Sequence, residues 1–256
     1  MSDIDLGKFY NFFSHVGIKP SGPVTNETWL EAVKLLDENF EKLRQRIPIV
    51  NESAASYIKD DFGVRNTTTA NVGELGWSFS NLTITYVNES GRPGIINCAV
   101  GVATGALFNP VTASVAMHTS EFFDVIWKVK IPASLVLTAL RFGLFNGAAT
   151  LNPPADGIYY EWLAADTNWF GVNRAAAAQT RIDTGVPVVI DEWFTLRLRR
   201  KSANAISFST NLGRDLDNLT NIPSVAANPV AQIINAAGTK NMQLDFFSNL
   251  ITNLVR

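Results

Sequence analysis

Apolar and polar residues alternate with a period of two along most of the chain after residue 77. In the run EFFDVIWKVKIP, every second side chain from Phe123 to Ile131 is apolar, and charged side chains stand at most positions between them. Comparable runs are WSFSNLTITYV, IINCAVGVATGALF, VLTALRFGLF, EWFTLRLRR, AISFST and MQLDFFSNL. Turn-forming tracts such as GRPG, NPPADG and NLG separate them. Many short strands joined by turns predict an antiparallel two-sheet sandwich or jelly roll, which we place at residues 66–256.

Residues 1–62 have a different texture, because they are rich in charge and carry a helical period. Within residues 25–47, apolar side chains recur at alternating spacings of four and three, at Trp29, Val33, Leu36, Phe40, Leu43 and Ile47. This is the seam of a short heptad repeat, and Pro48 ends the helix. A parallel coiled coil between identical chains is one interpretation, and a surface helix packed on its own domain is the other. The bulk of Trp29 and Phe40 favours three chains over two, so we expect a homotrimer.

An apolar cluster precedes this helix, close to the first residue. Its members lie within two helical turns and are Leu6, Phe9, Tyr10, Phe12 and Phe13. So much apolar surface near a terminus must be buried against something. We interpret the cluster as an anchor that docks against another protein, with folding back onto the neighbouring helix as the alternative.

Several tracts of the β region follow one another in a recognisable order. They are RFGLF at 141–145, DGIYYEW at 156–162, NWFGVNR at 168–174, RIDTGVPV at 181–188, EWFTLRL at 192–198 and LDFF at 244–247, preceded by GELGW at 73–77. This order resembles the concanavalin-like, or laminin-G-like, jelly-roll domains of tailed-phage virion proteins. The resemblance implies a two-sheet sandwich carried on a virus particle, with the heptads as the stalk or anchor of a fibre or head appendage.

The resemblance fails at one place. After SFST, members of that group have a small hairpin with Asp-Gly at its tip, whereas this chain has the longer polar tract NLGRDLDNLTNIPS at 211–224. This departure concerns the local turn and not the sandwich.

Composition and charge narrow the classes of partner. Charged residues make up 17% of the 256 residues and the formal net charge is −2, which gives no electrostatic footprint for nucleic acid. Cys98 is the single cysteine, so an internal disulfide and a cysteine-rich metal site are excluded. No apolar run reaches the roughly 20 residues of a membrane span, so we expect no membrane insertion. The acidic first residues do not resemble a signal peptide, which favours assembly into a virion in the host cytoplasm.

Catalytic patterns are missing from the sequence. Retaining glycanases of jelly-roll shape need two carboxylates about 5 Å apart at alternate positions of one strand. Asp191 and Glu192 would point to opposite faces of a strand, and the two aspartates of DLD at 215–217 stand in a turn-rich tract. The two histidines, His15 and His118, are far apart in the sequence and lie in no nucleophile or zinc motif. We therefore expect no catalytic residue, no cofactor and no metal.

The hairpin DGIYYEWLAADTNWFGVNR at 156–174 is the one candidate binding surface. By strand parity we assign one apolar set to the core, namely Ile158, Tyr160, Trp162, Phe170 and Val172. The other face would present Tyr159, Glu161, Trp169 and Asn173. Aromatic rings beside a carboxylate and an amide are typical of sugar sites, so these four are candidate glycan contacts. The alternative is that the N-terminal arm or another subunit covers this face.

These observations predict a non-enzymatic structural protein of a tailed-phage virion. It would trimerise through residues 25–47, bind other virion proteins through its N-terminal arm, and display the jelly roll. It could stand on the tail and baseplate or on the capsid. A carbohydrate-binding module that contacts host surface glycans is the alternative, and glycan hydrolysis ranks last.

Overall fold

A computed structural model describes residues 55–62, 71–90, 92–108, 117–118, 122–132, 139–150, 152–202, 204–211 and 213–252. The structure divides into two units, Met1–Val50 and Asn51–Arg256, and all described residues belong to the second. The predicted trimer seam and the predicted anchor lie outside the described residues. Within the described ranges, no helix is long and apolar enough to cross a membrane.

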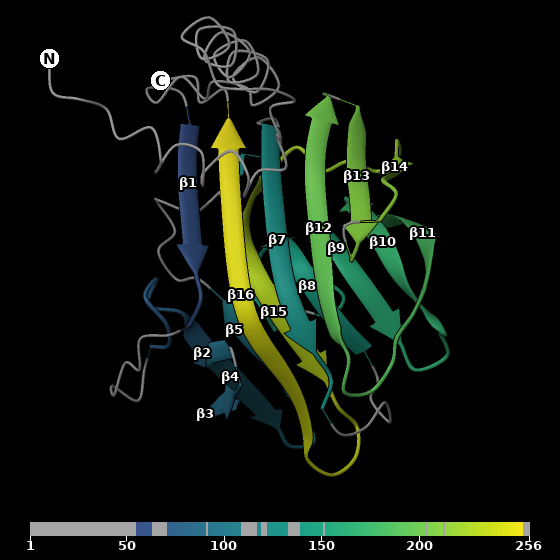
Figure 1. The fold of residues 1–256 in the computed structure, drawn as a ribbon. Helices are drawn as coiled ribbons and strands as arrows, with labels where there is room; N and C mark the ends of the chain where they lie inside the picture. The colour runs from purple at the N-terminus through teal and green to yellow at the C-terminus, as the bar shows by residue number, and fades with distance from the viewer. Residues whose placement is uncertain are drawn as a thin grey trace, which may run out of the picture. The chain divides into compact units, whose positions relative to one another are not determined.

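Two antiparallel sheets form the second unit, one in front of the other in Figure 1. The first has the order β14-β13-β12-β7-β16-β4-β3, with β1 paired to β16 beside this path. Its strands are β1 (Ala55–Asp60), β3 (Thr83–Glu89), β4 (Arg92–Val100), β7 (Phe122–Lys130), β12 (Trp193–Ser202), β13 (Ala205–Thr210), β14 (Leu216–Asn218) and β16 (Lys240–Thr252).

The second sheet has the order β11-β10-β9-β8-β15-β5-β2, with β6 paired to β15 beside it. Its strands are β2 (Ser78–Ser80), β5 (Thr104–Phe108), β6 (Met117–His118), β8 (Ala139–Asn146), β9 (Asp156–Leu163), β10 (Asn168–Ala175), β11 (Ala178–Pro187) and β15 (Ala226–Ile234). The predicted antiparallel two-sheet sandwich is confirmed.

The core lies between the sheets and follows from the period of two. In β7, the side chains from Phe123 to Val129 at odd positions are all buried, whereas Asp124 and Lys128 between them are partly exposed. Aromatic rings then run through the core from one sheet to the other. Trp127 has its ring centroid 4.7 Å from that of Phe247 in the same sheet and 6.3 Å from that of Phe142 in the opposite sheet. Burial of such large side chains is the main source of stability in a sandwich.

The prediction of helix as far as residue 62 is wrong for residues 55–60, which form β1. This strand pairs antiparallel with the last part of β16, from Ala55 opposite Thr252 to Asp60 opposite Phe247. The charge density of residues 1–62 indicated a helix, but burial here follows a strand: Tyr57 and Lys59 are exposed and Asp60 is buried. The sandwich therefore begins before residue 66.

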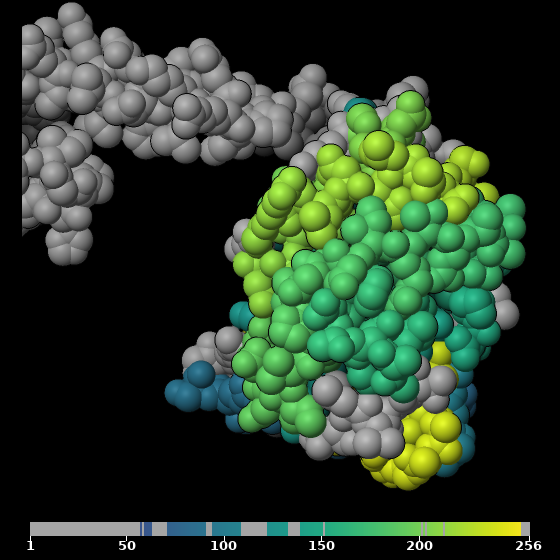
Figure 2. Space-filling view, turned by 90° about the vertical axis from the view of Figure 1, so that its right-hand side faces the viewer, coloured from purple at the N-terminus to yellow at the C-terminus, as the bar shows by residue number. Residues whose placement is uncertain are grey.

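The polar tract 211–224 closes one side of the sandwich. Its short strand β14 pairs with β13 in the first sheet. Three of its side chains also reach Thr180 in β11 of the second sheet: the Asn218 amide donates to the Thr180 carbonyl at 3.2 Å, and Thr220 and Asn221 bond to the Thr180 hydroxyl at 2.7 Å. Figure 2 looks onto this side, where the yellow-green atoms of the tract lie against the green atoms of β10 and β11. The tract thus forms a polar seam between the sheets.

Candidate functional site

The register of the β9–β10 hairpin decides where the predicted glycan contacts lie. Glu161 pairs with Phe170, and Tyr160 pairs with Gly171. Residues directly opposite each other share a face. Phe170 therefore lies on the outer face with Glu161, while Trp169 on the alternate position lies on the core face with Tyr160. The sequence prediction placed these two β10 residues on the wrong faces, because the turn between the strands sets the register.

Two of the four predicted glycan contacts are therefore inside the sandwich. Trp169 is 0% exposed, and its ring centroid lies 5.9 Å from Phe142 and 5.7 Å from Phe194. Asn173 is also fully buried, and its amide donates to the backbone carbonyls of Asn218 and Thr220 at 3.3 and 3.1 Å. Trp169 belongs to the core and Asn173 to the seam, so neither is placed to contact a glycan.

Tyr159 does lie on the outer face of the second sheet, but it too is 0% exposed. It belongs to a second apolar cluster on that face, whose buried members are Ala106, Phe145, Tyr159, Val172 and Val230. Its ring meets that of Phe145 at 5.2 Å, edge to face, and lies over Gly157, where an added Cβ would be 3.1 Å from the ring. Burial raises the pKa of the Tyr159 phenol. Phe108, Phe170 and Ala149, the last in the β8–β9 loop, pack against this cluster.

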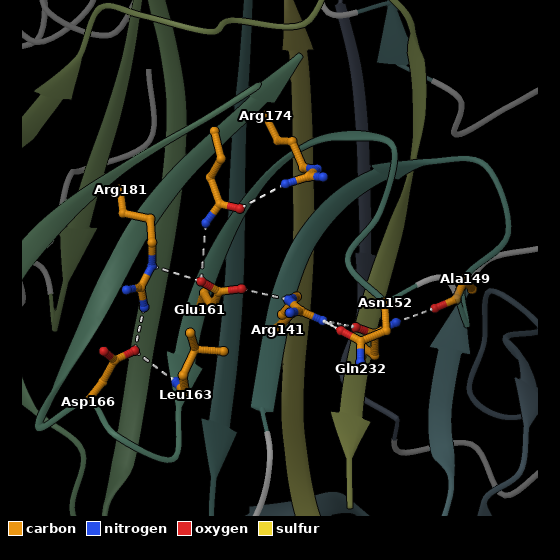
Figure 3. A network of polar contacts seen from close by, with 10 residues as sticks. Arg141, Ala149, Asn152, Glu161, Leu163, Asp166, Arg174, Arg181 and Gln232 are labelled. Carbon is orange, nitrogen blue, oxygen red and sulfur yellow. Dashed lines mark hydrogen bonds and ion pairs between the residues drawn. The ribbon is translucent and has the colours of Figure 1, made fainter. Parts of the chain in front are cut away.

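Beside Tyr159, the outer face carries a chain of charged and polar side chains, which we call the Glu161 network (Figure 3). Glu161 is 2% exposed. One carboxylate oxygen is 2.8 Å from Arg141 Nε, and the other is 2.8 Å from Arg181 Nε. The carboxylate of Glu161 is thus held between two guanidinium groups, one from the adjacent strand β8 and one from β11, two strands away on the other side.

Further contacts extend the Glu161 network in both directions. Arg181 also forms an ion pair with Asp166, and its guanidinium lies 4.0 Å from the centre of the Phe170 ring. On the other side, Arg141 donates to Asn152 at 2.9 Å and to Gln232 at 2.8 Å. The Gln232 amide donates in turn to the carbonyl of Ala149 at 2.8 Å. The network therefore ties four strands, β15, β8, β9 and β11, to the β8–β9 loop.

The outer face of β9 presents a single carboxylate. The outer positions of β9 are Gly157, Tyr159, Glu161 and Leu163, so the strand supplies one carboxylate and not the closely spaced pair of a retaining glycanase. Glu161 is buried between the guanidinium groups of Arg141 and Arg181. Among the described residues, no group of three or more His, Cys, Asp or Glu side chains could hold a metal ion.

The chain matches no protein-family model and no curated protein at a significant level. Among solved structures, a protein of unknown function from Shewanella oneidensis MR-1 matches with a TM-score of 0.59 at 12% identity, covering 93% of this chain and 99% of that one. The Emp47p carbohydrate recognition domain matches with a TM-score of 0.52 at 12% identity, over 80% of this chain and 99% of that one. A carbohydrate esterase from the Shiga toxin-encoding bacteriophage phi24B matches with a TM-score of 0.50 at 13% identity, over 70% and 93%.

The fold is that of a concanavalin-like jelly roll. At these identities the likeness concerns the fold alone. The jelly roll agrees with the fold that the tracts between residues 141 and 247 implied. The structure also shows which side chains of those tracts lie in the core. Ile158, Tyr160 and Trp162 are core residues as predicted, whereas Phe170 and Val172 pack on the outer face instead.

Sequence reasoning missed the Glu161 network, apart from Glu161 itself. Its members come from strands that are up to 91 residues apart in sequence, as Arg141 and Gln232 are. A signal was present in the sequence: Arg141 stands in the otherwise apolar tract ALRFGLF, and Gln232 stands within VAQII. A charged or amide side chain inside such a strand must find a partner if it is buried.

Proposed function

We propose that this chain is a non-enzymatic structural protein of a tailed-phage virion, trimeric through residues 25–47, which displays the jelly roll on the particle. The buried region around Tyr159 and Glu161 on the outer face of the second sheet is the observation that carries the proposal. Glu161, at the centre of that face, is buried between Arg141 and Arg181, and Tyr159 beside it is covered. A face built in this way favours a structural role over catalysis.

The tract GELGW supports the virion part of the proposal. It is the part of the resemblance that precedes the first long strands, and in this chain it forms a tight turn in which Val72 and Trp77 exchange backbone hydrogen bonds of 2.8 Å in each direction. Trp77 is fully buried in the core. The fold likeness to a bacteriophage protein is compatible with the same assignment.

The glycan-binding alternative loses the residues on which it was based. Tyr159, Glu161, Trp169 and Asn173 are all buried. None of the four presents a ring or a polar group to solvent for a sugar to contact, so we do not propose glycan binding at this hairpin.

The trimer is tested by the mass of the full chain in solution, measured by light scattering. We expect about three times the 28.0 kDa of one chain. Val33→Glu together with Leu36→Glu places charges on the seam and should give the mass of a single chain. Lys34→Glu, next to the seam but off it, is the matched control and should leave the trimer intact. A single-chain mass for the unchanged protein would refute the trimer.

The virion assignment is tested on purified particles. An antibody raised against the jelly roll should label intact virions at discrete positions in electron micrographs. Particles that contain no copy of the chain by mass spectrometry, from cells that produce it, would contradict the assignment. Incubation of the purified chain with polysaccharides should release no reducing ends.

A further inference from the structure

β1 occupies an unusual place in the first sheet. The long strand β16 pairs on one flank with β7. On its other flank, its first half pairs with β4, between Lys240 and Leu244, and its second half pairs with β1, between Phe247 and Thr252. At the edge of the sheet in Figure 1, β1 thus fills a gap beside β16 that no other described strand fills. Removing β1 would leave the strand order of both sheets unchanged.

The last residue of β1 is a buried carboxylate held by N–H donors. Asp60 is 0% exposed. One of its oxygens accepts from the backbone N–H of Phe62 at 2.7 Å. The other accepts from the backbone N–H of Leu75 at 2.9 Å and from the indole N–H of Trp77 at 3.0 Å. No lysine or arginine of the described chain forms an ion pair with Asp60. The three hydrogen bonds therefore offset the cost of removing this carboxylate from water.

The turn Val72–Trp77 is shaped around this carboxylate. Gly73 has a φ of +71°, and a Cβ at that position would lie 2.4 Å from a carboxylate oxygen of Asp60. Glycine is therefore required at residue 73 by both backbone conformation and space. At the end of the turn, the Trp77 ring packs against Phe247 at 4.9 Å and Trp127 at 5.5 Å. Asp60 thus joins β1 directly to the centre of the core.

We propose that Asp60 and the turn Val72–Trp77 form a lock that fixes β1, and with it the point at which the chain enters the jelly roll, to the rest of the sandwich. The lock holds by hydrogen bonds from N–H groups to one carboxylate, so a single atom change at residue 60 opens it. Its use rests on the proposed function: a displayed domain held by its N-terminal side keeps a fixed orientation only if its first strand cannot peel away. The lock itself can be tested without any virion.

The test compares amide hydrogen exchange of full-length wild-type protein and Asp60→Asn. The side-chain NH2 group of asparagine cannot accept a hydrogen bond, so at least one of the three N–H donors would lose its acceptor. We therefore expect β1 to detach from β16 while the other strand pairs stay formed. We expect exchange in residues 55–60 to rise by about tenfold or more, with exchange in β8 and β9 unchanged. Trypsin should also cleave after Lys59 in the variant and leave that bond intact in the wild type.

Two further variants keep the lock falsifiable if Asp60→Asn folds poorly. Trp77→Phe removes the indole N–H and keeps an aromatic ring in the core, so it should raise exchange in β1 by a smaller factor than Asp60→Asn. Glu74→Gln makes the matching charge change at an exposed residue of the turn and should leave the exchange of β1 unchanged. The lock is refuted if β1 stays protected in Trp77→Phe and Asp60→Asn, or if β1 and β8 lose protection together. This test measures hydrogen exchange in β1 alone. A negative result would therefore refute the lock without bearing on the solution mass or the particle location that test the virion proposal.

Discussion

At the scale of single residues, Glu161 shows how a polar group can be buried at the centre of a sheet. Its two carboxylate oxygens face Arg141 and Arg181, and Arg141 is itself satisfied by Asn152 and Gln232. Buried ion pairs contribute little net stability, but breaking one leaves an uncompensated charge. The identity of each partner therefore matters more than the strength of any single contact.

Arg141→Met should destabilise the fold. Glu161 would keep Arg181 but lose its most buried partner, and Gln232 and Asn152 would lose a donor. We expect the free energy of unfolding in urea to fall by about 3 kcal/mol, at the low end for breaking a buried pair. Arg214→Met, at an exposed position, is the control and should change it by less than about 0.5 kcal/mol. Equal effects of the two variants would mean that the network is not a structural element.

Lys130 gives a prediction for pH. Burial disfavours its ammonium group, but hydrogen bonds to Glu89 and Asp191 outweigh burial and raise its pKa. A pKa raised on folding adds stability below the unfolded value of about 10.4, and this stability is lost as the pH rises through the folded-state pKa. The difference in unfolding free energy between wild type and Lys130→Met should thus be constant from pH 7 to 9 and shrink above about pH 10.4. Denaturant titrations at each pH measure it, and a difference that grows above that pH would contradict the assignment.

At the scale of elements, the alternation in the sequence predicted individual strands well. It predicted poorly how paired strands align their faces. β7 could be predicted with its faces, because Phe123, Val125 and Trp127 repeat without interruption. For β9 and β10 the strands were predicted but the pairing of faces was not, since the turn between them sets the register. β1 was missed because six residues with two charges carry too little pattern to outweigh the helical texture before them.

Side-chain hydrogen bonds join the two sheets at the seam formed by residues 211–224. Asn173→Ala would leave the carbonyls of Asn218 and Thr220 without their donor in a buried place. We expect a loss of about 2 kcal/mol in unfolding free energy, measured in urea. Thr83→Ala, at an exposed position of β3, is the control and should have little effect. If Asn173→Ala were as stable as the control, the seam would not contribute to holding the sheets together.

At the scale of the whole molecule, the sandwich could be predicted from the sequence, but the strand order could not. Long-range pairing such as β7 between β12 and β16 joins segments that local pattern does not relate. The same limit explains why the Glu161 network was missed and why Tyr159 and Trp169 were expected at the surface. Parity states which side chains share a face, whereas the loops that cover a face belong to the tertiary structure.

The division of the chain after Val50 predicts that the jelly roll folds without the N-terminal unit. A protein of residues 51–256 should keep the β-type circular dichroism spectrum of the full chain and a cooperative thermal transition within a few degrees of it. Its mass in solution should be that of one chain. A loss of cooperative unfolding would show that the jelly roll depends on the preceding residues.

The pairing of Ala55 with Thr252 has a consequence for topology and engineering. Paired antiparallel residues have Cα atoms about 5 Å apart, so the sandwich starts and finishes at one point of its surface. A short glycine–serine bridge could connect these ends, and new termini could be cut at the exposed turn Ala236–Gly238 between β15 and β16. Such a circular permutant would keep every strand pair. The whole sandwich could likewise be inserted into a surface loop of a host protein.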